Sequence, residues 1–218
     1  MEPFEFKQCV SIHKSTGKKA ENLRQLRDLI AGASEESIVH HTYHYFLKGH
    51  MLEYTNDFAQ WAGESLEERA LAEHLSSPDP YDFKEVEALR KRIVELIDHY
   101  LEHFPEPRPV MPGDEFFFNE TVTLIFPVGI RARNLAEFFA AIKFIDEGSI
   151  YYHFYESRIR LGLGSDDFSR WFEDTLGEKD LAEKIRGIDP LMSTIEKIRT
   201  FISGLVEEEV RRDMEIVR

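Results

Sequence analysis

The stretches Phe4-Glu5-Phe6-Lys7-Gln8-Cys9-Val10 and Phe116-Phe117-Phe118-Asn119-Glu120-Thr121-Val122 decide the fold, because each opens one of two copies of a single unit. At an offset of 112 residues the same residue types recur after Phe4, Phe6, Val10, Gly17, Ala20, Asn22, Leu23, Ile30, Glu35, Ser37, Ile38, His41 and Tyr43. At an offset of 110 they recur after Asp57, Phe58, Trp61, Leu66, Glu68, Leu71, Ala72, Glu73, Asp79 and Pro80. Identities sustained at nearly one offset indicate an internal duplication.

The duplication predicts two helical units, at residues 1–103 and 115–218, joined by a proline-rich linker at residues 104–114 that is stiff and extended. Each copy opens with an aromatic and β-branched run that predicts one short strand, at residues 4–13 or 116–126, before a turn glycine, Gly17 or Gly129. Five helical patterns follow in each copy. We therefore expect a mainly α fold, α+β at most. Its two strand-plus-five-helix units would pack as one body about a pseudo-two-fold, with the N-terminal strands able to pair across it.

Helix starts can be predicted from side chains that accept hydrogen bonds from the amides of the first turn. Asn22 and Asn134 each stand three residues before a Gln or Glu, which is the spacing of a capping box. Asp57 and Asp167 are predicted to cap the helix that carries the tryptophan of each copy. Further capping boxes are predicted at Ser65 and Thr175.

Composition narrows the classes of function. Among 218 residues, 27 are basic and 41 acidic, giving a net charge of −14. Binding to nucleic-acid phosphates depends on clustered Lys and Arg, so we expect no nucleic-acid partner. The single cysteine, Cys9, excludes an intrachain disulfide and favours a cytoplasmic location. Neither a signal peptide nor an apolar run of about 18 residues is present, so no membrane association is expected.

Histidines provide candidate metal ligands. His40 and His44 are four residues apart in one predicted helix, a spacing that can present two imidazoles to zinc or another divalent transition metal. The duplication argues against a metal, because Tyr152 and Glu156 stand at the corresponding positions of the second copy. We expect no cofactor, with a divalent metal such as Zn²⁺ at His40 and His44 as the alternative.

Two polar pairs recur without a capping role: His41 with His153, and Tyr43 with Tyr155. His41 lies toward the apolar side of its predicted helix, where a buried imidazole must be hydrogen-bonded or shift its pKa. These residues are candidates for ligand binding in a cleft shared by the copies, and the competing interpretation is a satisfied core or interface histidine. No nucleophile stands beside a base, so no catalytic residue is predicted.

Three runs carry a resemblance to a known family: Phe4-x-Phe6-x-x-Cys9-x-Ser11-Ile12-His13-x-x-Thr16-Gly17, Asn56-Asp57-Phe58-Ala59-x-Trp61 and Asp167-Phe168-Ser169-Arg170-Trp171. They resemble a prokaryotic family known only as a domain of unknown function. The resemblance covers nearly the whole chain, including the stretch from Tyr151 to Tyr155. It implies an uncharacterised prokaryotic cytoplasmic protein and supplies no activity, cofactor or catalytic residue.

The recurrent residues are almost all core or cap residues, which favours a non-catalytic binding or protein-interaction module with an unidentified protein partner. The alternative is a small-molecule or metal-dependent enzyme whose site lies between the copies, around His41 and His153. The oligomeric state is left open.

Overall fold

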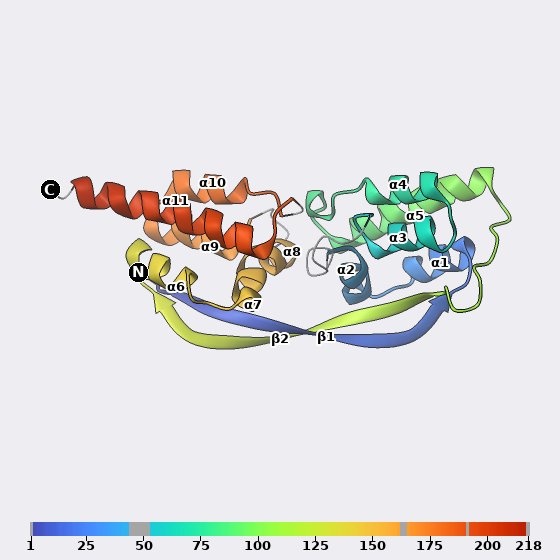
Figure 1. The fold of residues 1–218 in the computed structure, drawn as a ribbon, viewed down its shortest axis with the longest axis horizontal. Coiled ribbons are helices and arrows are strands. Elements are labelled where there is room, and N and C mark those ends of the chain that lie inside the picture. Colours follow the sequence, from blue (N-terminus) through green and yellow to red (C-terminus); the bar gives the residue numbers. More distant parts are fainter. Residues whose placement is uncertain (1, 44–52, 162–164, 191, 217–218) are drawn as a thin grey trace. The chain divides into compact units, whose positions relative to one another are not determined.

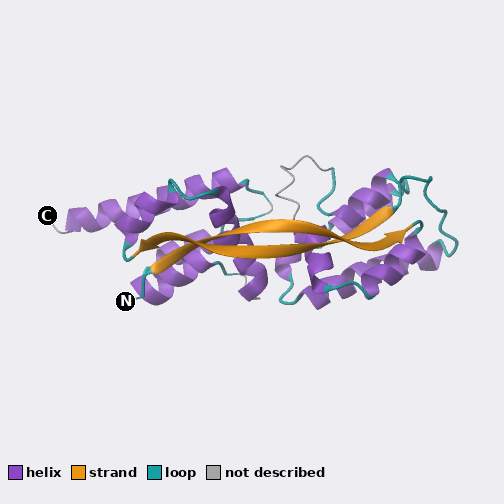
Figure 2. Ribbon diagram, turned by 90° about the horizontal axis from the view of Figure 1, so that it is seen from below, coloured by secondary structure: helices purple, strands orange, loops and turns teal. Residues whose placement is uncertain are grey.

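The computed structural model of the chain describes residues 2–43, 53–161, 165–190 and 192–216. The fold is α+β, 58% helical and 17% strand. Strand β1 spans Phe4–Ala20 and strand β2 spans Phe116–Ala132, and the two pair antiparallel in a two-stranded sheet (Figures 1 and 2).

Helices follow each strand. After β1 come α1 (Leu23–Ala31), α2 (Glu35–Tyr43), α3 (Asp57–Glu64), α4 (Arg69–Ser76), the 3-10 turn η2 (Pro80–Asp82) and α5 (Val86–His103). After β2 come α6 (Leu135–Ile142), α7 (Glu147–Ile150), the π-helix η3 (Tyr151–Glu156), α8 (Ser157–Leu161), α9 (Asp167–Trp171), the π-helix η4 (Phe172–Leu176), α10 (Lys179–Arg186) and α11 (Ile195–Ile216). Within the described ranges, none of these helices has the length and apolar character needed to cross a membrane.

The chain forms two compact units that exchange the starts of their strands. Unit 1 comprises Met1–Val10 and Thr123–Arg218, and unit 2 comprises Ser11–Val122. The start of β1 therefore belongs with helices of the second sequence copy, and the start of β2 belongs with helices of the first. Each compact unit takes residues from both sequence copies.

Aromatic packing anchors the exchanged start of β1 in unit 1. The ring centroids of Phe4 and Phe6 lie 5.7 and 5.4 Å from that of Phe138 in α6. Phe168 in α9 completes the cluster, 5.4 Å from Phe4. Phe6, Phe138 and Phe168 are fully buried, so this strand segment is part of the core rather than a covering layer.

The start of β2 is anchored in unit 2 by the same kind of cluster. Phe116 stacks on Phe58 of α3 with ring centroids 5.2 Å apart, and Trp61 meets Phe116 edge-on at 5.9 Å. Phe118 is 1% exposed and lies 6.3 Å from Phe58. The core of unit 2 therefore depends on residues more than fifty positions beyond α3 in the sequence.

The prediction of a mainly α fold with one short strand per copy is wrong. Both strands continue past the predicted ends at residues 13 and 126, and Gly17 and Gly129, predicted as turns, lie inside them with φ of +73° and +79°. In each strand three of the first six residues are buried, and the rest of the strand is partly or fully exposed except for its last residue, Ala20 or Ala132. The remainder is held by pairing with the other strand, which the apolar pattern does not record. The fold is therefore α+β rather than mainly α, and the predicted pairing of the two strands is confirmed. The pseudo-two-fold stays a prediction.

The predicted N-caps Asn22 and Asn134, which directly precede their helices, are confirmed. The amides of Gln25 and Glu137 donate to the side chains of Asn22 and Asn134 at 3.0 and 2.9 Å. The capping boxes predicted at Ser65 and Thr175 are wrong. Helices α4 and α10 begin later, at Arg69 and Lys179, and their N-cap residues make no side-chain capping bond.

Candidate functional site

The N-caps of α3 and α9 are Asn56 and Asp166, one residue earlier than the predicted Asp57 and Asp167. Asn56 Oδ1 accepts from the amide of Ala59 at 2.9 Å, and Asp166 Oδ1 accepts from that of Ser169 at 2.8 Å. Each sequence copy has two adjacent residues able to cap, and the earlier one does so. The carboxylates of Asp57 and Asp167 are therefore left to make other bonds.

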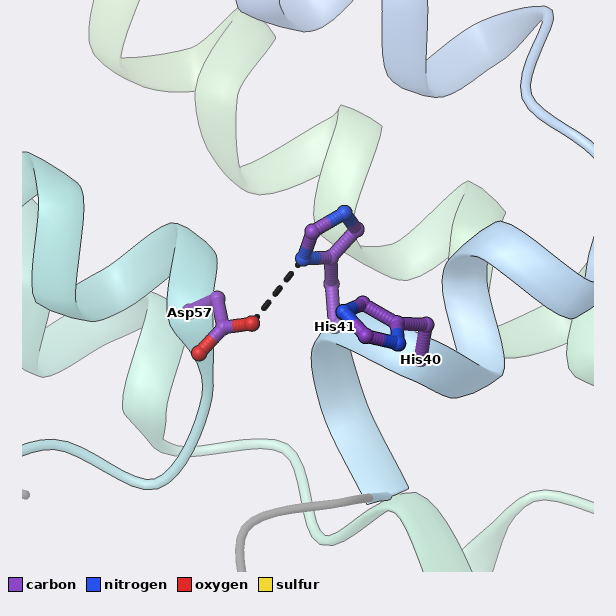
Figure 3. A group of neighbouring side chains, drawn as sticks. All are labelled: His40, His41 and Asp57. Carbon is purple, nitrogen blue, oxygen red and sulfur yellow. Dashed lines mark hydrogen bonds and ion pairs between the residues drawn. The ribbon is translucent and has the colours of Figure 1, made fainter. Parts of the chain in front are cut away.

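Asp57 instead bonds His41, the recurrent histidine of α2 (Figure 3). The distance from His41 Nδ1 to Asp57 Oδ2 is 2.9 Å, and the His41 Nε2 atom accepts from the backbone amide of Asn119 in β2 at 3.0 Å. Because Nε2 accepts a hydrogen bond, the neutral ring carries its proton on Nδ1, and this N–H donates a hydrogen bond to the carboxylate. We call these three groups the His41 clamp.

Unit 1 repeats this geometry around His153 in η3. The His153 Nδ1 atom lies 2.9 Å from Asp167 Oδ2, and Nε2 accepts from the backbone amide of Lys7 in β1 at 2.8 Å. Phe4 lies against the ring with centroids 4.8 Å apart. We call His153, Asp167 and the Lys7 amide the His153 clamp. Each clamp ties an exchanged strand to a helix of its unit.

The backbone amides held by the two clamps lie where the alternation of buried and exposed residues along each strand is interrupted. In β1 the buried positions are Phe4, Phe6 and Cys9, so the period of two breaks between Phe6 and Cys9, where Lys7 lies. The pattern of β2 breaks in the same way at Asn119. A backbone donor at such an irregularity needs a partner, and the imidazole supplies one. The sequence signal for the partner carboxylates was present, since Asp57 recurs as Asp167, but it was interpreted as capping.

Tyr43 and Tyr155 point elsewhere. Their hydroxyls donate to the backbone carbonyls of Pro80 and Ser193, each at 2.7 Å. Burial raises the pKa of both phenols, so they stay protonated donors. The structure therefore brings His41 together with Asp57 and separates it from the Tyr43 hydroxyl, and both tyrosines tether the backbone.

Of the predicted metal pair, His40 is described and His44 lies outside the described residues. His40 comes together instead with His41 and Asp57, with their ligand atoms all within 4.8 Å of one another (Figure 3). His41 fits a metal poorly. Coordination through Nδ1 would move its proton to Nε2, where it would face the amide proton of Asn119. Zinc at His40 and His44 stays a prediction, and the clamp geometry adds no third ligand.

The hydrogen bond to Nε2 also argues against a role of the clamp histidines in catalysis. A histidine whose Nδ1–H is held by a carboxylate is the arrangement of a general base, which works through a free Nε2 lone pair. In both clamps that lone pair already accepts a hydrogen bond from a partly buried backbone amide, 3.0 Å away for His41 and 2.8 Å away for His153. The imidazole of each clamp therefore orients a strand and does not present a free Nε2 lone pair.

A pocket of about 370 Å³ opens beside the His153 clamp in unit 1. Its wall includes Lys7 from β1 and Arg170, Trp171 and Asp174 from α9 and η4. His153 and Asp167 themselves also line the pocket, so a ligand there would meet the edge of the clamp together with the charged side chains of Lys7, Arg170 and Asp174.

Cys9 is the one thiol of the chain, and it is buried in β1 with its Sγ atom 3.8 Å from the carbonyl oxygen of Gly148. Burial raises the pKa of the thiol, and the nearby Glu156 carboxylate raises it further. We expect the native protein to react with a thiol reagent at least about 100-fold more slowly than a free cysteine. In a Lys18→Cys variant, the added exposed thiol would react fast and Cys9 slowly. Two fast thiols in the folded variant would contradict this placement.

Comparisons with known proteins identify a matching family and a solved structure with a similar fold. A family model described as "Family of unknown function (DUF5752)" matches residues 1–207. The chain belongs to this family. It is also similar to the solved structure titled "The structure of OrfY from Thermoproteus tenax", with 33% identity, a TM-score of 0.80 and coverage of 95% of each chain. No curated protein matches the chain at a significant level. Membership confirms the resemblance predicted from the sequence, and it assigns no activity to the clamps.

Proposed function

We propose that the protein is a non-catalytic, cytoplasmic protein-binding module that contacts its partner through an apolar segment of the paired strands. The segment consists of Leu124, Ile125 and Phe126 in β2 and Val10 in β1, all within unit 1. The exposed fractions of the three β2 residues are 42%, 47% and 42%. This exposure of three consecutive apolar residues is the observation that carries the proposal.

Successive residues of a strand face opposite sides of a sheet, so three in a row expose apolar surface on both sides. In unit 1 the helices lie on one side of the strands (Figure 1). Exposed runs of this kind are unfavourable in water, and on folded proteins such patches mark interaction sites. Each strand of a two-stranded sheet also keeps one edge without a strand partner among the described residues, and a partner can pair there.

The duplication shows that the strand itself does not require these side chains. At the offset of 112, Ile125 and Phe126 correspond to His13 and Lys14 of β1, which are polar and exposed. The same strand architecture therefore accepts polar residues at these positions. The counterpart of Leu124 is Ile12, which is also apolar and is 47% exposed, so within this run the copies differ in polarity at Ile125 and Phe126. Burial by a partner fits the chemistry of these two side chains.

The clamps favour a non-catalytic role for the recurrent polar residues. His41 and His153 bond a backbone amide on one side and a carboxylate on the other, which is a structural use of the imidazole. The single cysteine supports a reducing, cytoplasmic setting.

The test is a double substitution that copies the chain's own alternative, Ile125→His with Phe126→Lys. We expect at least about a tenfold loss of affinity for the partner, since anchor residues at an interface are worth 2 kcal/mol or more. Stability should change by less than about 1 kcal/mol, because both positions are exposed. The measurement is quantitative capture of proteins from the source organism, followed by binding titration of the recovered protein.

Phe144→Lys is the matched control, because Phe144 is 85% exposed in unit 1 but lies outside the strands. The control should bind the partner as the unchanged protein does. Unchanged binding by the double variant, or repeated capture of no specific protein, would refute the proposal.

A further inference from the structure

An apolar groove of about 550 Å³ lies in unit 1 beside the N-terminus of α6 and the last turns of α11. Leu135, Leu176, Val210 and Met214 provide its apolar lining, and Glu178 and Asp213 provide acidic groups. Met214 is 63% exposed, so a large apolar side chain stands open to water at this groove. Unlike the strand surface, the groove has a sequence-related counterpart in unit 2 that shows what can fill it.

The counterpart is found by matching the last helices of the two copies. The buried residues Leu89, Ile93 and Ile97 of α5 correspond at an offset of 109 to Ile198, Ile202 and Val206 of α11. The end of α5, at His103, thus corresponds to Arg212, whereas α11 continues to Ile216. The first copy leaves its helix at this point and turns into the proline-rich segment 104–112, while the second copy continues as helix.

In unit 2 that segment runs along the counterpart of the groove. Arg24 at the start of α1 donates to the carbonyl oxygen of Pro105 at 2.6 Å. The amide of Val110 donates to the carbonyl oxygen of Glu21 at 2.8 Å. Between these contacts, Arg108 donates to the carbonyl oxygen of Leu66 and lies 3.1 Å from a carboxylate oxygen of Glu67.

In unit 2 the proline-rich segment buries surface whose counterpart in unit 1 is exposed at the groove. Leu66, beneath Arg108, is 2% exposed, whereas its counterpart Leu176 is only partly buried. Ala136 stands in unit 1 where Arg24 stands in unit 2. The surface that the first copy buries with its own chain is therefore present in unit 1 and uncovered by described residues.

The charged groups beside the groove of unit 1 indicate which ligand would fit it. In unit 2, Glu68 accepts a hydrogen bond from the Tyr100 hydroxyl at 2.5 Å. At the counterpart in unit 1, Glu178 faces acidic neighbours. Burial raises the pKa of Glu178, and the negative charges of Glu209 and Asp213 raise it further, whereas Arg212, ion-paired with Glu209 at 2.7 Å, lowers it. The excess of carboxylates favours a further cationic group. In unit 2 the segment brings Arg108 to Glu67, whose counterpart in unit 1 is Gly177, so the carboxylates of Glu178 and Asp213 would receive the cation there.

We propose that the groove of unit 1 binds an extended, proline-containing segment of a partner protein that carries an arginine, in the manner of the chain's own residues 104–110. Proline restricts the unbound segment to extended conformations, which lowers the entropy cost of binding, and apolar side chains fill the groove. The arginine would bond the carbonyl oxygen of Leu176 and the nearby carboxylates. This site goes beyond the proposed strand surface and does not depend on it.

The probe is a fluorescent peptide with the sequence of residues 104–112, Phe-Pro-Glu-Pro-Arg-Pro-Val-Met-Pro, titrated against the full chain by anisotropy. We expect saturable binding that weakens at least about tenfold when the peptide arginine is replaced by alanine. A Leu176→Lys protein should lose the binding. Ala136→Arg, which restores the arginine found at position 24, should strengthen it about threefold or more. The Ile125→His/Phe126→Lys protein should bind the peptide unchanged, which separates this site from the strand surface.

Absence of saturable binding, or equal binding by the Leu176→Lys protein, would overturn the proposal. Because Leu176→Lys could destabilise η4, its melting temperature and circular dichroism are measured alongside, and the peptide variant tests the site on unchanged protein. The other possible occupant of the groove is the same segment from a second copy of the chain, and sedimentation of the unlabelled chain tests for it. A dimer that Arg108→Ala dissociates would replace the partner protein with the same segment from a second copy.

Discussion

Replacing Phe118 with alanine lowers the free energy of unfolding by about 3–5 kcal/mol, the usual cost of removing a buried phenylalanine side chain from a packed core. Phe118 is 1% exposed and packs against Phe58, Phe116 and the ring of His41. The substitution leaves a cavity among rings that rigid helices hold in place, so the loss is not recovered by collapse. Chemical denaturation measures the change.

The location of the loss tests the exchange of strands. Although Phe118 belongs to the second sequence copy, it packs in unit 2, so amide hydrogen exchange should rise in α1–α5 rather than in α6–α11. Phe6→Ala should have the opposite distribution, because Phe6 packs on Phe138 in unit 1. Phe117→Ala is the control, because the side chain of Phe117, next to Phe118 in the sequence, is 54% exposed. This substitution should lower the free energy of unfolding by less than about 1 kcal/mol. Faster exchange confined to the helices that follow Phe118 in its own copy would contradict the observed packing.

The exchange could not be predicted from the sequence, although its participants could. The aromatic start of each copy was predicted to be a short strand, because aromatic and β-branched runs favour strands. Which helices it packs against is a long-range choice that no local pattern encodes. The two copies have nearly the same residues at the contacting positions, so pairing within a copy and pairing between copies look alike in the sequence.

The strand lengths were missed for a different reason. Residues 14–19 and 127–131 are polar, glycine-containing or proline-containing, and such segments usually form turns. They form strand because residues 14–19 lie opposite the start of β2 and residues 127–131 lie opposite the start of β1, where the main chains pair. The ion pairs Lys19–Glu115 and Arg131–Glu5 cross between the strands at these two places. Those groups are distant in sequence, so the stabilising element becomes visible only once the strands are placed together.

The candidate site was predicted in part. Recurrence selected His41 and His153 from nine histidines, and the structure places both in equivalent buried clamps. Asp57 and Asp167 recurred just as clearly, but a capping role seemed to account for them. Asn56 and Asp166, directly before them, perform that role. The partner of each Nε2 atom is a backbone amide, which has no side-chain signature and so could not be found in a sequence.

Replacing His153 with phenylalanine should lower the free energy of unfolding by about 2–4 kcal/mol, even though the ring and its packing against Phe4 are kept. Phenylalanine cannot accept the amide of Lys7 or donate to Asp167, so a buried donor and a partly buried carboxylate lose their partner together. Each such loss costs about 1–3 kcal/mol. Urea denaturation gives the change. His99→Phe serves as the control, because the side chain of His99 is 69% exposed and its replacement should change stability by less than about 0.5 kcal/mol.

A double-mutant cycle separates the clamp from simple loss of packing. If His153 and Asp167 act as one unit, Asp167→Asn should destabilise the unchanged protein by about 1 kcal/mol and should cost much less when His153 is already phenylalanine. Equal effects in both backgrounds would mean that the carboxylate acts independently of the imidazole. The same cycle on His41 and Asp57 should return a similar coupling, because the Nδ1 to Oδ2 distance is 2.9 Å in both clamps. Agreement between the two cycles would establish that the recurrent histidines hold the exchanged strands in place, which leaves partner binding to the surfaces of unit 1.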